Sequence, residues 1–225
     1  RDGQQIRLSF DVVRKYLVDG HPEFVTDAEI VLYMGQCKAR GLNPFKRDCY
    51  LVKYTRDDPA ATIVSIDYYR ARAKVQEDCA GWSNGIIVKT EKETIWREGE
   101  MLLPGEELLG GWFRARPKGW DMDRVWTVGL ARYIKKTREG NPTRFWSKDN
   151  QPGQIAKVAE SQGLRRVWPD EFAKLYVEEE IVSGLPIQDT DAGESKIDMP
   201  KRKSETKTES GEKQEAKKPE QESEP

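Results

Sequence analysis

Basic and aromatic side chains alternate in the part of the sequence between Gly110 and Tyr176. This segment holds 14 Lys and Arg residues against 7 Asp and Glu residues, although the whole chain has a net charge of −1. Phosphates require cations and unpaired bases stack on flat rings, so proteins that hold single strands combine the two. The rings are Trp112, Trp120, Trp126, Tyr133, Phe145, Trp146 and Trp168. The segment therefore favours a single-strand-binding surface, although large aromatic residues are also ordinary core residues.

The basic residues expected to contact DNA lie on a short helix, on two strands with the loop after them, and on a later helix. They are Arg70, Lys74, Arg114, Arg116, Arg132, Lys135, Lys136, Arg144, Lys157, Arg165 and Arg166. Tyr69, on the same short helix as Arg70 and Lys74, is also a candidate for a ligand-facing surface. An arginine beside an apolar stripe can pack its stem and present its guanidinium to a phosphate, which favours Arg165 and Arg166. Two alternatives stay open: Lys157 could pair with Glu160, and the loop over 135–142 could be a solvated connection rather than a clamp.

Side chains suited to catalysis are few and scattered. His21 is the only histidine, and its Asp-Gly-His-Pro setting is typical of a turn. Carboxylates that a magnesium site would need to bring together stand singly, at Asp67, Asp121, Asp123 and Glu160. The cysteines have the spacing of neither a zinc site nor a disulfide framework; they are Cys37, Cys49 and Cys79. The phosphate-binding glycine loop of ATP-driven recombinases is missing. We therefore expect no catalytic or metal-binding residues.

Composition divides the chain into three predicted parts. Residues 183–225 contain no Phe, Trp or Tyr, and they carry 8 Lys and Arg against 11 Asp and Glu. Such a segment cannot bury enough apolar surface to offset its ordering entropy, so a disordered charged tail is predicted there. We expect an N-terminal helical segment over 1–24 and one domain over 25–182. Without an apolar run of eighteen residues or a signal peptide, the protein is expected to be soluble and cytosolic.

The order of predicted elements gives the fold class. Thr26 and Glu29 have the spacing of a capping box, which predicts a helix up to about Arg40. Strands are expected over 47–54, 62–66, 82–89, 94–96, 109–116 and 124–132, and helices over 68–77, capped by Asp67, over 152–168, and after Asp170. The prediction is an α+β fold, a mainly antiparallel twisted sheet with helices packed on one face.

Side-chain alternation along the last two predicted strands separates their residues by face. The first strand would place Trp112, Arg114 and Arg116 on one side. The second would place Arg124, Trp126, Val128, Leu130 and Arg132 on one side.

Two separated motifs resemble a known family. The first runs from Cys37 through Gly41-Leu42-Asn43-Pro44-Phe45 to Asp48-Cys49-Tyr50, and then to Ile63–Arg70 with its Val-x-x-Asp-Tyr-x-Arg step. The second is the Pro-led stretch with Trp146, Pro152, Ile155, Lys157, Ala159, Glu160, Leu164, Arg165, Trp168 and Pro169. Together, and in this order, they resemble the RecT/Bet single-strand annealing family of phage recombinases over roughly residues 25–180.

This resemblance implies ATP-independent annealing of complementary DNA strands in homologous recombination, by rings or helical filaments of the protein in a bacterial host cell. It implies a narrow basic groove in which Arg165 is the first choice for a backbone contact, followed by Lys157 and Arg70, with Asn43 and Asp67 supporting the groove. The partners it implies are single-stranded DNA, its complement, a phage exonuclease and a host single-strand-binding protein. No cofactor is expected, and Mg²⁺ is a candidate modulator of DNA binding.

The sequence departs from the family pattern in three places. Gly163 stands where alanine is common, Arg166 adds a second base beside Arg165, and the final lobe that recruits partners in some members is not recognisable. Two other functions remain as alternatives. One is a Mg²⁺-dependent nuclease in which Asp67 and neighbouring carboxylates hold the metal, and the other is a replication scaffold that does not bind DNA.

Overall fold

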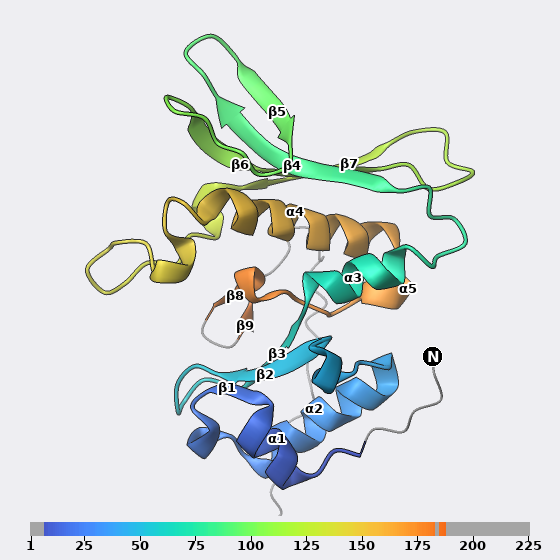
Figure 1. The fold of residues 1–225 in the computed structure, drawn as a ribbon, viewed down its shortest axis with the longest axis vertical. Helices are drawn as coiled ribbons and strands as arrows, with labels where there is room; N and C mark the ends of the chain where they lie inside the picture. Colours follow the sequence, from blue (N-terminus) through green and yellow to red (C-terminus); the bar gives the residue numbers. More distant parts are fainter. Residues whose placement is uncertain (1–6, 183–184, 188–225) are drawn as a thin grey trace, which may run out of the picture. The chain divides into compact units, whose positions relative to one another are not determined.

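The computed structural model of the chain describes residues 7–182 and 185–187. Its helices and antiparallel strands confirm the predicted α+β class (Figure 1). The tail predicted over 183–225 lies outside the described residues except at 185–187, where Leu185–Pro186 (β9) pairs with Ile181–Val182 (β8). The domain boundaries proposed at residues 24 and 182 stay predictions.

The larger sheet has four strands in the order β5-β4-β6-β7, and every neighbouring pair is antiparallel. The strands are β4 (Trp82–Lys89), β5 (Thr94–Glu98), β6 (Glu107–Ala115) and β7 (Arg124–Gly129). The long helix α4 (Gln151–Val167) lies along one face of this sheet (Figure 1). The predicted strands and the Pro-led helix are confirmed, with ends shifted by a few residues.

Two glycines allow α4 to lie directly against the sheet. A Cβ atom at Gly111 would stand 2.4 Å from the carbonyl oxygen of Ile155, and a Cβ at Gly163 would stand 2.1 Å from the Phe113 ring. Neither distance is compatible with a side chain. The Phe113 ring therefore fills the space that the alanine common in the resembled family would need at position 163.

The predicted alternation holds within the strands but ends earlier than expected. Phe113 faces α4 and pairs with Trp126 across β6 and β7, so Trp126 faces the helix too, whereas Arg114 faces the opposite side. The prediction that Arg132 continues the second strand is wrong. A 3-10 turn, η3 (Leu130–Arg132), replaces the last part of that strand, because the turn buries Leu130 in the core.

A smaller layer is built from the first part of the chain. Its elements are α1 (Phe10–Tyr16), β1 (Val18–Gly20), η1 (Pro22–Phe24), α2 (Asp27–Arg40), η2 (Pro44–Lys46), β2 (Cys49–Lys53) and β3 (Ala61–Val64). The capping box of Thr26 and Glu29 and the β2-β3 hairpin are confirmed. Lys53 Nζ lies 2.8 Å from Glu29. Burial alone would raise the pKa of Glu29, but hydrogen bonds from Lys53, Thr26 and Ala60 outweigh it and lower that pKa to about 2.

Two helices begin differently from their predictions. Ser65, not Asp67, caps α3 (Ile66–Ala73): its backbone is extended, and its Oγ accepts a hydrogen bond from the Asp67 N–H at 3.2 Å. The short α5 (Pro169–Phe172) begins on its proline, so Asp170 lies inside the first turn instead of capping it. Both predictions of an aspartate cap are therefore wrong.

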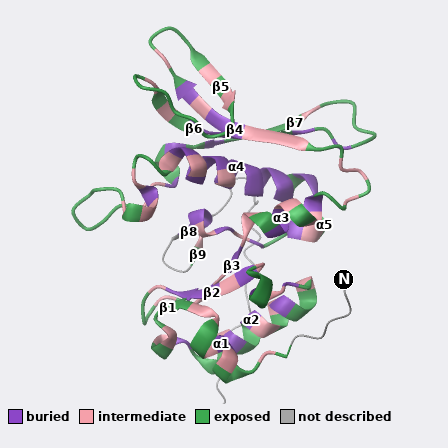
Figure 2. Cartoon of the chain, in the orientation of Figure 1, coloured by how far each residue is buried: buried purple, intermediate pink, exposed green. Residues whose placement is uncertain are grey.

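Helix α4 is buried along nearly its whole length (Figure 2). The sequence predicted a helix with one apolar stripe, yet Glu160, Ser161, Gln162 and Arg165 are buried as well. The sheet covers one side of the helix, while α3, α5 and the 3-10 turn η5 (Glu178–Glu180) contact it elsewhere. The chain therefore buries a polar face of α4, and those polar groups need partners.

Gly163→Ala tests the contact between α4 and the sheet. The added Cβ would overlap the Phe113 ring, so we expect the free energy of unfolding to fall by about 1–3 kcal/mol, as for other overpacked cores. Gly35→Ala is the matched control, because Gly35 lies in α2 and a Cβ atom added there would meet nothing within 4 Å. It should stabilise by about 1 kcal/mol. Urea unfolding measures both, and equal stability changes of the two variants would contradict the packing described.

Candidate nucleic-acid interface

One buried carboxylate belongs to α4 itself, that of Glu160. Arg70 donates to it from Nε at 3.0 Å and from Nη2 at 2.8 Å, and the Trp82 indole donates at 2.9 Å. The Glu160 side chain is only 2% exposed, whereas that of Arg70 is 41% exposed and also pairs with Asp67. Glu160 therefore joins α4 to α3 and β4, and it pairs with Arg70 rather than Lys157.

The second buried carboxylate is that of Glu180, in η5. Arg165 forms a bidentate ion pair with it, with one of the two contacts at 2.9 Å from Nη1. Ser161 Oγ donates to the same carboxylate at 3.1 Å and Gln162 Nε2 at 3.2 Å. The side chains of Glu180 and Arg165 are 1% and 7% exposed. These bonds compensate a carboxylate that would be very costly to bury alone.

Gln162 extends this network to the edge strand β7. Its Oε1 accepts a hydrogen bond from the Trp126 indole at 2.8 Å, and its Nε2 donates to the Tyr133 hydroxyl at 2.6 Å as well as to Glu180. Gln162 is fully buried, so its amide has few alternative orientations. The Trp126 ring is therefore held in position from behind, by the same network that includes the buried ion pair.

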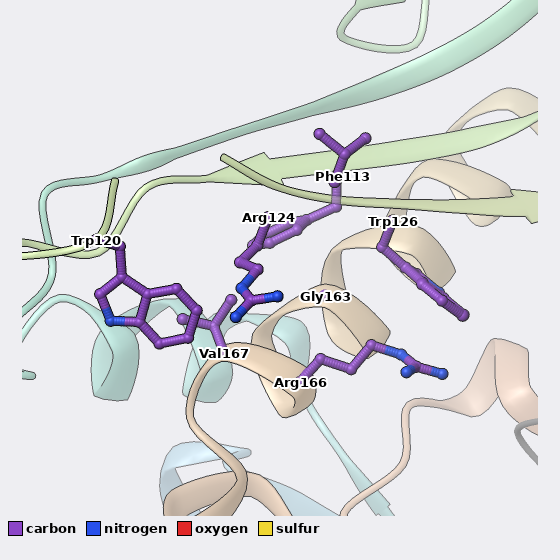
Figure 3. A pocket seen from close by; sticks show the side chains of 8 residues that line it. Phe113, Trp120, Arg124, Trp126, Gly163, Arg166 and Val167 are labelled. Carbon is purple, nitrogen blue, oxygen red and sulfur yellow. The ribbon is translucent and has the colours of Figure 1, made fainter. Parts of the chain in front are cut away.

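A pocket opens between β7 and the C-terminal part of α4, with a volume of about 390 Å³. It is lined by Phe113, Trp120, Arg124, Val125, Trp126, Gly163, Arg166 and Val167. Figure 3 shows Trp120 and Trp126 on two sides of the pocket, with the Arg124 side chain between them. Its wall therefore combines two indole rings with two guanidinium groups.

Each guanidinium of the pocket lies over an indole. The Arg124 Cζ is 4.3 Å from the centre of the Trp120 ring, and the Arg166 Cζ is 3.4 Å from the centre of the Trp126 ring. Arg124 forms no ion pair with another residue in the described part of the chain. Stacked in this way, a cation keeps its N–H donors directed at an incoming anion while the ring limits its movement. The arrangement can accept a phosphate and an unpaired base together.

The other predicted DNA contacts are spread over the molecule. Arg116 pairs with Asp123 at 2.7 Å, and Arg114 lies over Trp112 on the opposite face of the sheet. Lys135 and Lys157 contact the acidic turn η5. Exposed positions are held by Lys74, Arg132, Lys136 and Arg144. Of the predicted set, the structure brings only Arg166 into the pocket.

Two expectations about individual side chains are wrong. The Arg165 guanidinium is not presented to solvent, because it is buried against Glu180, and Arg166, one position further on, is the exposed base. Tyr69 was a candidate for a ligand-facing surface, but it is fully buried and stacks on Phe172 with ring centres 4.9 Å apart.

The sequence-based selection also missed a pocket residue and included several core rings. Arg124 was not among the predicted DNA contacts, although strand alternation placed it on the same face as Trp126, and that signal would have been enough to select it. The core interpretation holds for four of the seven rings, which are buried: Trp112, Tyr133, Trp146 and Trp168. Trp120, at 37% exposure, is the most accessible of the pocket rings.

The carboxylates considered for a nuclease do not converge. Asp67 pairs with Arg70, which also holds Glu160, and Asp123 pairs with Arg116. Within residues 7–182 and 185–187, no group of three or more His, Cys, Asp or Glu side chains is placed to hold a metal ion. No helix in the same ranges is both long enough and apolar enough to cross a membrane.

A family model described as the RecT family matches residues 3–198, which is most of the chain. A search of the curated proteins finds no match.

Arg165→Ala tests the buried ion pair. It would leave the Glu180 carboxylate buried and unpaired, so we expect the free energy of unfolding to fall by about 3–5 kcal/mol. The exposed pair of Arg116 and Asp123 supplies the control, because Arg116→Ala should cost no more than about 1 kcal/mol. Replacing both partners, as Arg165→Met with Glu180→Leu, should recover much of the loss. Denaturant unfolding followed by circular dichroism measures all three, and a loss below about 1 kcal/mol for Arg165→Ala would contradict the assignment.

Proposed function

The chain belongs to the RecT family, and from this premise we propose that it anneals complementary DNA strands without consuming a nucleotide, holding one strand at the Trp120–Arg166 pocket. The Trp120–Arg166 pocket is the one described above, with Trp120, Arg124, Trp126 and Arg166 as its rings and cations and with Phe113, Val125, Gly163 and Val167 as the rest of its lining. Strand annealing in phage recombination and binding of single-stranded DNA are the activities that membership of the family supplies. The independence from ATP, which the resemblance implied, and the placement of the strand at this pocket are both part of the proposal.

The observation that carries the proposal is the pairing of each pocket cation with a ring. Stacking of a base on an aromatic side chain contributes roughly 1–3 kcal/mol and does not depend on base identity, since every base has a flat face. A volume of about 390 Å³ is at the small end of the range for ligand sites and suits a single base. A base inside a duplex is already stacked between neighbours, so such a pocket favours unpaired strands.

Cations outside the pocket are proposed as contacts to the DNA backbone. Lys74, Arg132, Lys136 and Arg144 are exposed, and Arg114 projects from the far face of the sheet. Contacts of this kind carry no sequence information, and they weaken as salt rises. They would let the protein bind DNA of any sequence, which the annealing of arbitrary complementary strands requires.

Annealing itself requires no bond to be broken. The protein has only to neutralise phosphates on two strands and leave their bases free to pair. The buried carboxylates of Glu160 and Glu180 form ion pairs with Arg70 and Arg165, and the proposal gives these carboxylates no role in the annealing step. Assembly into rings or filaments, Mg²⁺ as a modulator, and recruitment of an exonuclease or a single-strand-binding protein remain predictions from the family.

The proposal is tested by following two labelled complementary oligonucleotides in the absence of nucleotide. We expect the protein to accelerate their annealing, with binding that weakens steeply as salt rises. Failure to accelerate annealing at low salt would contradict the proposal. The nuclease alternative is tested by incubating the same DNA with the protein and Mg²⁺, with and without a chelator. Cleavage that the chelator prevents would support the nuclease. Absence of any DNA binding would favour the scaffold.

Arg124→Ala tests the pocket within this function. It removes one phosphate contact and the cation above Trp120, so we expect weaker binding to single strands and a salt slope smaller by about 1. Trp120→Ala should lose about 1–3 kcal/mol of binding free energy with little change in that slope. The control is Arg14→Ala on α1, an arginine paired with Asp27 and remote from the pocket in sequence. Equal losses from Arg14→Ala and Arg124→Ala would show that the pocket is not the DNA site.

A further inference from the structure

Lys135 is a half-buried lysine that lacks an ion-pair partner among the described residues. Its Nζ donates to the backbone oxygen of Glu178 at 3.2 Å, and it lies 5.6 Å from the centre of the Phe145 ring and 6.0 Å from that of Tyr54. Burial lowers the pKa of Lys135, and the carboxylates of Glu178 and Glu179 partly offset this effect. An ammonium has three donors, so two remain to be satisfied.

The carboxylate of Glu179 is poorly compensated compared with its neighbour. Its side chain is 7% exposed, and its ion pair is with Lys157 Nζ at 3.4 Å. Burial raises the pKa of Glu179, whereas Lys157 acts in the opposite direction. Glu180, next in the same turn, receives hydrogen bonds from three α4 side chains at shorter distances. Of these two carboxylates, Glu179 is the more weakly bound, so an incoming anion can displace it from Lys157 more easily than it could displace Glu180 from Arg165.

The Tyr54 hydroxyl supplies an independent sign of an incomplete site. Its oxygen is buried and has no hydrogen-bond partner in the described part of the chain. Burial, followed by the charges of Glu178 and Glu179, raises the pKa of Tyr54 to about 12, so the group stays a neutral donor. Buried polar groups are nearly always hydrogen-bonded, so an orphan beside a weakly paired turn needs an explanation.

We propose that Lys135, Lys157 and the Tyr54 hydroxyl form a second anion site, which takes one phosphate of a DNA backbone and is closed in the free protein by the ion pair of Glu179 with Lys157. The inference rests on the proposed function, because it assumes that the ligand is DNA. It adds a site separate from the Trp120–Arg166 pocket, and it assigns the acidic turn a role as an internal competitor.

A phosphate satisfies the groups that Glu179 leaves incomplete. Its oxygens can accept from both ammonium groups and from the hydroxyl, in charge-assisted bonds stronger than the 3.4 Å contact they replace. Only side chains need to move, because Val177 and Ile181 on either side of the turn are 2% exposed and hold its backbone in the core. The competitor reduces the apparent affinity by the fraction of molecules in which the site is closed.

Glu179→Gln tests the proposal, with binding of a labelled oligothymidylate followed by fluorescence anisotropy. The variant keeps the shape of the side chain but removes the competing charge. We expect affinity to rise about fivefold, since the site no longer has to be vacated. Glu91→Gln, in the exposed turn between β4 and β5, changes the net charge equally and should leave affinity nearly unchanged. Unchanged or weaker binding by Glu179→Gln would overturn the proposal, as would equal gains in both variants.

Tyr54→Phe gives a second measurement that does not depend on Glu179. The ring is kept and the donor is lost, so we expect weaker binding, and the loss should be larger when Glu179→Gln is also present. An unaltered affinity of Tyr54→Phe in the otherwise wild-type protein would overturn the site, and this result can be obtained even if Glu179→Gln fails to fold. If wild-type protein does not bind the oligonucleotide, the proposed function fails; if it binds and Arg124→Ala alone weakens binding, only this site fails.

Discussion

The carboxylate of Glu180 is buried, so its negative charge must be balanced by hydrogen-bond donors and a cation inside the protein. Much of the architecture around α4 follows from that requirement. A buried carboxylate costs several kcal/mol unless its partners satisfy it. Arg165, Ser161 and Gln162 do so from one face of α4. This draws the acidic turn against the helix, and it explains why a helix so rich in polar residues is buried nearly throughout.

The same constraint positions the proposed DNA pocket. Successive residues of a helix point about 100° apart, so with Arg165 directed at Glu180 the next residue, Arg166, is turned toward β7. Gln162 holds the Trp126 ring beneath Arg166 through the hydrogen bond to its indole. The absence of a side chain at Gly163 lets Phe113 close the floor. Two adjacent arginines thus have different tasks, one in the core and one at the pocket.

Local sequence signals were sufficient for the features that depend on neighbours in the chain. The capping box at Thr26, the β2-β3 hairpin and the alternation along β6 and β7 depend on residues a few positions apart, and each is found. Paired motifs, rather than composition, identified the family. What sequence could not supply was the burial of Arg165, since its partner Glu180 lies in a short turn with no periodic pattern. Glu179 lies in the same turn, so the sequence could not indicate either that it would compete with a phosphate for Lys157.

Photo-cross-linking tests most directly whether a single strand is held between β7 and the end of α4. An oligonucleotide containing iodouracil, bound at low salt and irradiated, reacts with aromatic side chains that touch its bases, and mass spectrometry locates the adducts. We expect adducts at Trp120 and Trp126. Trp96 lies beside Trp112, which is on the opposite face of the sheet. Adducts at Trp96, with none at Trp120 or Trp126, would contradict the proposed placement of the strand.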